Sequence, residues 1–153
     1  MSQCLAVLIS VIAYAGPAPG RDIADHPDVR TFFWSLMQEN RYGFSESEAA
    51  AFVVVRHDGS IDFVRWPSSE QHHRAVWRGA FPTGTIAIVH THPNWIPEPS
   101  AIDARTARRK GVPVYVLTRT QIQKTTGDDV MTVARGDWRP EAPVALAHII
   151  RRP

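Results

Sequence analysis

The stretch VHTHPNWIPEPSAID, from Val89 to Asp103, joins the end of an apolar segment to the start of a helical pattern. GTIAIV, which leads into it from Gly84, predicts a buried strand, and SAIDARTARRKG predicts a helix that ends at Gly111. The loop between them, PNWIPEP, holds three prolines in seven residues, and their fixed φ angles make it stiff. The stretch therefore predicts a strand, a rigid turn and a helix that begins at Ser100.

Two histidines and an acidic residue in this stretch indicate a metal site. Successive side chains of a strand point to opposite faces, so His90 and His92 point the same way, with Cα atoms about 7 Å apart. Ser100 and Asp103 lie three residues apart and share one face of the first helical turn. Two histidines and one carboxylate leave the fourth position of a Zn²⁺ ion open, which is typical of catalytic sites. The pattern predicts one Zn²⁺ per chain, held by His90, His92 and Asp103.

A structural interpretation of the same residues stays open at this point. Ser-x-x-Asp at the start of a helix also fits a capping box, in which the two side chains bind the free N–H groups of the first turn. A histidine pair on a strand can equally be two ordinary surface residues. It is the combination of all four residues in one register that favours the metal site.

The remaining segments predict an α/β domain of the α+β type, with a mixed central sheet flanked by helices. A helix is expected over Asp25–Gly43, capped by Asp25 or His26, and a loop with a short helix over residues 67–82. Strands are expected at 49–56, 61–66, 84–92, 112–118, 121–126 and 130–138. Asp58-Gly59 and Gly127-Asp128-Asp129 mark two hairpin turns between them.

Composition limits the function classes. The 153 residues suit one domain, which we place at residues 21–140, followed by a weakly patterned tail at 141–153. A net charge of +2 gives no strong signal for nucleic-acid binding. Because Cys4 is the only cysteine, an intrachain disulfide and a multi-cysteine zinc site are both excluded.

Residues 1–20 predict a signal peptide and a linker. An apolar run from Cys4 to Ala15 ends in Ala13-Tyr14-Ala15, a small-x-small cleavage pattern, and is too short to span a bilayer. The first four residues contain no Lys or Arg, so a first strand or helix of the domain, or an incorrect start, stays an alternative. We expect export to the periplasm or beyond the cell.

The pattern His90-x-His92, seven residues, Ser100, two residues and Asp103 resembles the JAMM (MPN-plus) signature of the Mov34/JAB-domain zinc metalloproteases. A helix that ends in Arg-Lys-Gly before VPVYVLT is similar to the helix–strand step of the bacterial members. The resemblance covers about Asp25 to Trp138. It implies the cytidine-deaminase-like JAB/MPN fold and a zinc-dependent metallopeptidase or isopeptidase that acts on a peptide or protein.

The same resemblance implies roles for individual residues. It calls for a glutamate general base near the start of the first buried strand, where Glu46 and Glu48 are available. We choose Glu48, which directly precedes the apolar run, although Ser45-x-x-Glu48 also fits a capping box. Ser100 is implied as the hydrogen-bond donor to the developing oxyanion. Trp95, in the loop between the ligands, is a candidate substrate contact or an aromatic that anchors the loop.

Two functions from other classes stay as alternatives. The first is a metal-free protein-binding module on the same fold. The second is a nucleic-acid-associated role, which a run of cations on the predicted helix suggests: Arg105, Arg108, Arg109 and Lys110. Cations are also favoured at the C-terminal end of any helix. The remaining histidines examined as ligands are interpreted as surface or loop residues: His57, His72, His73 and His148.

Overall fold

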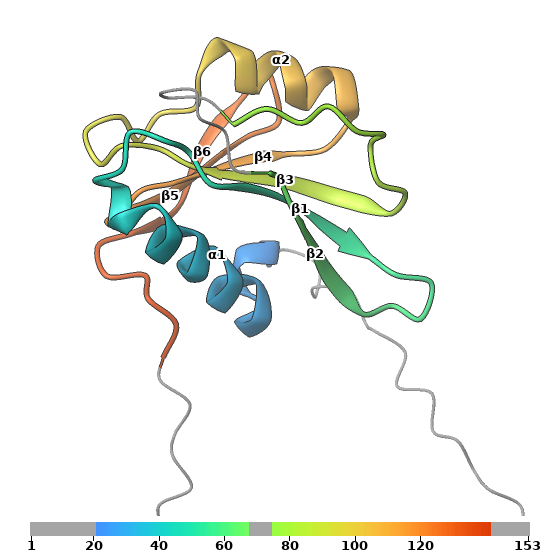
Figure 1. Cartoon of the computed structure of the whole chain (residues 1–153), viewed down its shortest axis with the longest axis horizontal. Coiled ribbons are helices and arrows are strands. Elements are labelled where there is room, and N and C mark those ends of the chain that lie inside the picture. Colours follow the sequence, from blue (N-terminus) through green and yellow to red (C-terminus); the bar gives the residue numbers. More distant parts are fainter. Residues whose placement is uncertain (1–20, 68–74, 142–153) are drawn as a thin grey trace, which may run out of the picture.

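The computed structural model describes residues 21–67 and 75–141, which form a six-stranded mixed sheet with one α-helix on each face (Figure 1). The helices are α1 (Pro27–Glu39) and α2 (Ala101–Lys110). The strands are β1 (Ala50–Val55), β2 (Ile61–Arg65), β3 (Thr85–Thr91), β4 (Val114–Leu117), β5 (Gln121–Thr125) and β6 (Val130–Arg135). The expected α+β domain with a mixed sheet flanked by helices is confirmed.

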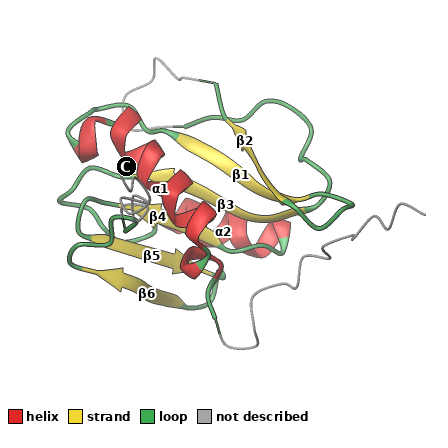
Figure 2. Ribbon diagram, turned by 90° about the horizontal axis from the view of Figure 1, so that it is seen from below, coloured by secondary structure: helices red, strands yellow, loops and turns green. Residues whose placement is uncertain are grey.

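The strand order is β2-β1-β3-β4-β5-β6. Every neighbouring pair is antiparallel except β3 and β4, which are parallel because α2 carries the chain back across the sheet between them. Seen from below, α1 crosses the near face of the sheet and α2 lies behind it (Figure 2). Both predicted hairpins form, and His57 is exposed in the first of their turns.

Several predictions fall on residues outside the described ranges. These are the signal peptide and linker at 1–20, the tail beyond residue 141, and the histidines at 72, 73 and 148. The short helix expected within residues 67–82 is absent from the described part of that segment, Pro67 and residues 75–82. Among the described residues, no helix is both long enough and apolar enough to cross a bilayer.

The first helix is shorter than the sequence predicts. His26 caps it, because its Nδ1 accepts a hydrogen bond from the Asp28 N–H, and Pro27 occupies the first turn. It ends at Glu39 rather than at Gly43. The Asn40 amide donates to the carbonyl of Ser47, and the chain reverses through a 3₁₀ turn, η2 (Arg41–Gly43), which contains left-handed backbone. Long-range hydrogen bonding at Asn40 therefore overrides the helical pattern.

The central strands β1, β3 and β4 are largely buried on both faces of the sheet. Apolar side chains from α1 pack against one face: Val29, Phe33, Leu36 and Met37. Alternate residues of β1 divide between the two sides, with Ala51 and Val53 facing α1, and Phe52 and Val54 facing α2. This explains why the sequence of β1 is apolar without interruption.

The pairing of β1 with β3 brings the candidate site together. The two strands are antiparallel, and Ala50 pairs with His90, so the start of β1 lies beside the end of β3. Beyond the last pair, the Thr91 N–H donates to the Ala49 carbonyl at 2.9 Å, and the Ala49 N–H donates to Thr91 Oγ1 at 3.0 Å. These bonds fix the chain at Glu48 next to the histidine pair.

Asn94 ties the loop after His92 to the turn after α1. Its amide nitrogen donates to the Tyr42 carbonyl at 2.8 Å, and its Oδ1 accepts from the Arg119 N–H at 2.9 Å. Gly43 allows this approach, because a Cβ at that position would overlap the Asn94 amide. Gly43 also has a left-handed φ of +82°.

We expect Gly43→Ala to lower the free energy of unfolding by about 1–2 kcal/mol more than Gly136→Ala. Both glycines have left-handed φ angles, +82° and +83°, but an added Cβ on Gly136 meets nothing within 4 Å. Only Gly43→Ala therefore disturbs the hydrogen bonds of Asn94. Urea unfolding of the two variants measures the difference, and equal losses would contradict the role given to Asn94.

Candidate metal centre

Five predicted residues from three separate segments line one cleft of about 510 Å³ on the α2 side of the sheet. Glu48 comes just before β1, His90 and His92 come from the end of β3, and Ser100 and Asp103 come from the start of α2. The His92 N–H donates to the Leu117 carbonyl at 2.8 Å, so this residue keeps the strand direction beyond Thr91. The fold thus brings these five residues to one cleft.

The two imidazoles stand nearly perpendicular, with ring centroids 4.7 Å apart and an interplanar angle of 83°. Both histidines are buried. His92 Nδ1 lies 2.9 Å from the Ile96 carbonyl oxygen, which can only accept, so Nδ1 carries the proton and donates it. This leaves the lone pair of His92 Nε2 free to bind a cation, an orientation that protein ligands of metals commonly adopt.

His90 lies between two carboxylates. Its Nδ1 is 3.4 Å from Glu48 Oε2, and its Nε2 is 3.0 Å from Asp103 Oδ1. Nε2 is buried and has no well-aligned hydrogen-bond partner despite the nearby oxygen. Ligands about 2 Å from one zinc ion lie roughly 3 Å from each other. The spacing of His90 Nε2 and Asp103 Oδ1 therefore fits two ligands of a single cation.

The capping interpretation of Ser100 and Asp103 is also correct. Asp103 Oδ2 accepts hydrogen bonds from the Ser100 N–H and from Ser100 Oγ, both at 2.7 Å, and the Asp103 N–H donates to Ser100 Oγ at 3.2 Å. One carboxylate oxygen thus caps α2, and the other faces His90. The capping box therefore forms, and it leaves Asp103 Oδ1 available toward His90.

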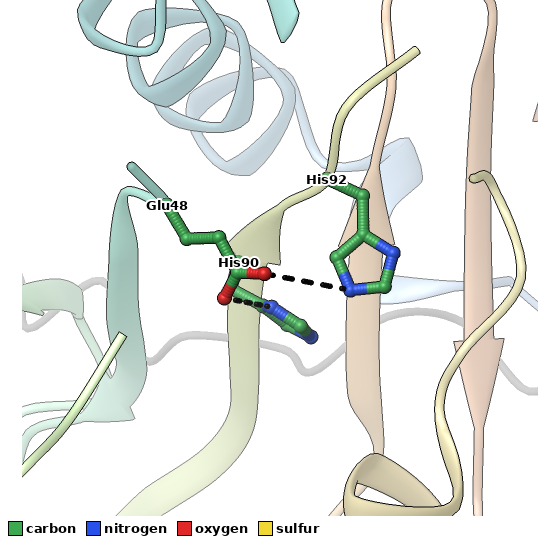
Figure 3. A group of neighbouring side chains, drawn as sticks. All are labelled: Glu48, His90 and His92. Carbon is green, nitrogen blue, oxygen red and sulfur yellow. Dashed lines mark hydrogen bonds and ion pairs between the residues drawn. The ribbon is translucent and has the colours of Figure 1, made fainter. Parts of the chain in front are cut away.

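Glu48, not Glu46, reaches the cluster. The side chain of Glu48 is only 13% exposed, with Oε1 4.0 Å from His92 Nε2 and Oε2 accepting a hydrogen bond from the Ala75 N–H at 3.2 Å. Figure 3 shows its carboxylate turned toward both imidazoles. Glu46 is exposed and does not line the cleft. Ser45-x-x-Glu48 forms no capping box, because a strand follows it.

Ligand atoms of Glu48, His90 and His92 all lie within 4.8 Å of one another, so this group can hold a metal ion. The ionisation states of the side chains in this cleft also favour a bound cation. Burial alone would raise the pKa of Glu48 and of Asp103, but the hydrogen bond and charge of His90 outweigh it and lower both pKa values. Burial and the charge of His90 lower the pKa of His92, which favours its neutral, ligating form.

The pKa of His90 reflects a negative electrostatic potential at the metal cluster. Burial lowers the pKa of this imidazole, yet the adjacent carboxylates of Asp103 and Glu48 together raise it well above its usual value. The two carboxylates therefore stabilise a positive charge at His90. A divalent cation would supply that charge in place of the proton.

A family model described as prokaryotic homologs of the JAB domain matches residues 35–133. The matched range runs from α1 to β6 and includes every member of the cluster. The chain belongs to this family. No curated protein and no solved structure matches the chain. The expected membership in the JAB family is thus confirmed, and the fold agrees with it.

Some features of this JAB domain carry no sequence signal. The Ile96 carbonyl that orients His92 and the Ala75 N–H that holds Glu48 are backbone groups, brought close by the fold.

Trp95 is 69% exposed and does not line the cleft, so its contact with substrate stays a prediction. Of the cations on α2, Arg108 contacts the Gly127 carbonyl and the Asp128 carboxylate within the domain.

We expect His92→Ala to reduce zinc from about one ion per chain to less than a tenth, because the cleft loses a ligand whose orientation is already fixed. His57→Ala is the matched control, since His57 is exposed in a distant turn and should leave zinc content unchanged. Elemental analysis of zinc-loaded, gel-filtered protein measures both. A His92→Ala protein that keeps a full complement of zinc would rule out this centre.

Ser100→Ala and Asp103→Ala separate helix capping from metal binding. Both remove side-chain hydrogen bonds at the start of α2, so each should cost about 1 kcal/mol of unfolding free energy in metal-free protein. Only Asp103→Ala should also abolish zinc binding, because only Asp103 has an oxygen facing His90. Chemical unfolding in EDTA and zinc analysis provide the two measurements. Equal zinc contents in both variants would remove Asp103 from the ligand set.

Proposed function

We propose that this JAB domain is a zinc-dependent metallopeptidase or isopeptidase that hydrolyses an amide bond in a peptide or protein. The observation that carries the proposal is one cleft in which a carboxylate faces two buried imidazoles, one with a hydrogen-bond-deficient Nε2. A metal-free binding module would gain nothing from leaving the buried His90 Nε2 without a hydrogen-bond partner, because burial of an unpaired polar atom costs free energy.

His90, His92 and Asp103 would hold the zinc ion. The chemistry supplied by Zn²⁺ in such a position is polarisation of the scissile carbonyl and a lower pKa for water. The orientation of Asp103 also favours metal binding. Its Oδ2 already accepts two hydrogen bonds from Ser100 at the start of α2. The carboxylate is therefore held in place before any cation arrives, which reduces the entropy cost of binding.

Glu48 would act as the general base. His90, His92 and the Ala75 N–H lower the pKa of its carboxyl, so the group is ionised at neutral pH and able to accept a proton from the attacking water. The same carboxyl would later give that proton to the leaving amine. The hydrogen bond from Ala75 fixes Oε2, and Oε1 is directed toward His92 and the open cleft.

Ser100 would stabilise the oxyanion. Its hydroxyl lines the cleft at the N-terminal end of α2, where the helix dipole favours negative charge. The hydroxyl donates to Asp103 Oδ2. To bind the oxyanion, it would exchange this hydrogen bond for one to the substrate.

We expect Glu48→Gln to lower kcat by about 10²–10⁴-fold on a mixture of internally quenched peptides, because the general base is lost. Zinc content should stay at one ion per chain. Glu46→Gln, two residues earlier and exposed, is the matched control and should keep full activity. If Glu48→Gln protein lost its zinc together with its activity, Glu48 would be a ligand rather than the base.

A further inference from the structure

The cleft continues beyond the metal cluster along β3. Ile88 lies two residues before His90, so its side chain points to the same face of the sheet, about 7 Å further along the strand. Val114 of β4 pairs with Ile88 in the parallel register and widens this floor. Both residues line the cleft. The floor of the cleft is therefore lined by imidazoles at the metal cluster and by aliphatic side chains next to it. A single substrate side chain is long enough to extend from the cluster to this aliphatic part.

The walls of this end of the cleft are apolar as well. On one side, α2 contributes Ile102, which directly precedes Asp103, and Thr106, which follows it by three residues. On the other side lie Trp66, Val76 and Trp77. Among the described lining residues, the carboxylates are Glu48 and Asp103, and both belong to the metal cluster. Away from the cluster, the described lining residues therefore carry no charge.

This apolar end is held in shape by packing. Trp66 and Trp77 both lie against Phe52, with ring centroids 5.1 Å away in each case. The Trp77 indole N–H donates to the Ala80 carbonyl at 3.0 Å. At the rim, Ile102 is 58% exposed, so its side chain can be reached from solvent. A preformed apolar pocket beside polar groups is the usual form of a ligand site.

We propose that this apolar end is a specificity subsite for a large aliphatic or aromatic side chain next to the scissile amide bond. The inference rests on the proposed function, since the metal cluster fixes where that bond lies. A charged substrate side chain would find no oppositely charged side chain among the described lining residues outside the metal cluster, and a glycine would leave the apolar walls exposed to water. The enzyme would accordingly prefer substrates with a large apolar residue over those with glycine at this position.

Hydroxamates test the subsite by binding alone, because their head group chelates zinc. Acetohydroxamate has no side chain, whereas 3-phenylpropanohydroxamate carries a phenyl group on a flexible chain that can enter the subsite from the metal. Titration into zinc-loaded protein should give at least about tenfold tighter binding for the phenyl compound, from the apolar area that it buries. Succinate monohydroxamate, with a carboxylate at the end of its chain, should gain nothing over acetohydroxamate.

A matched pair of variants on α2 locates the effect. Thr106→Phe fills the cleft and should remove the advantage of the phenyl compound while acetohydroxamate binds as before. Arg105→Phe adds the same side chain on the neighbouring exposed position, which does not line the cleft, and should preserve the advantage. If Thr106→Phe fails to fold, Ile102→Asp is a second variant at the rim of the cleft. It should weaken the binding of the phenyl compound and leave the binding of acetohydroxamate unchanged.

The outcomes separate the two proposals. Equal affinities of acetohydroxamate and 3-phenylpropanohydroxamate would overturn the subsite and leave the metal centre intact, and would indicate that this end of the cleft is closed to ligands. Loss of the phenyl advantage in Arg105→Phe as well as in Thr106→Phe would likewise overturn its location. If no hydroxamate bound, the metal centre itself would be wrong and the subsite would fall with it.

Discussion

The antiparallel pairing of β1 with β3 is the constraint on which the site depends. Glu48 is separated from the histidine pair by about forty residues of chain, and the pairing of Ala50 with His90 brings them together. The two hydrogen bonds between Ala49 and Thr91 extend that pairing to the last residue before Glu48. A register shift of one residue would turn the histidines to the opposite face of the sheet, toward α1.

Asp103 links the stability of the fold to the chemistry of the site. One of its oxygens satisfies N–H and O–H groups at the start of α2, and the other faces a buried imidazole. Burying a carboxylate costs free energy unless it is paired and hydrogen-bonded, and here both conditions are met by groups on two different elements. The same hydrogen bonds that begin the helix also fix the direction of the candidate ligand.

Much of this arrangement could be predicted from the sequence, because it depends on local periodicity. The alternation of β3 places His90 and His92 on one face, and the spacing of Ser100 and Asp103 marks the start of α2. The early end of α1 could not be predicted, since it depends on the contact of Asn40 with Ser47 across a reversal of the chain. The same is true of the apolar end of the cleft, where Trp66, Trp77 and Val114 come from segments that meet only in the folded domain.

The hydrogen bond from Ala75 to Glu48 has a consequence for how members of such a family could diverge. Ala75 holds Glu48 through its backbone N–H and also lines the cleft, so both its position along the chain and the size of its side chain are constrained. An insertion or deletion shortly before it would shift that N–H and reorient the base, with the ligands untouched. In the proposed enzyme, turnover and metal affinity would therefore evolve separately, the first through the length of a connection and the second through the identity of three side chains.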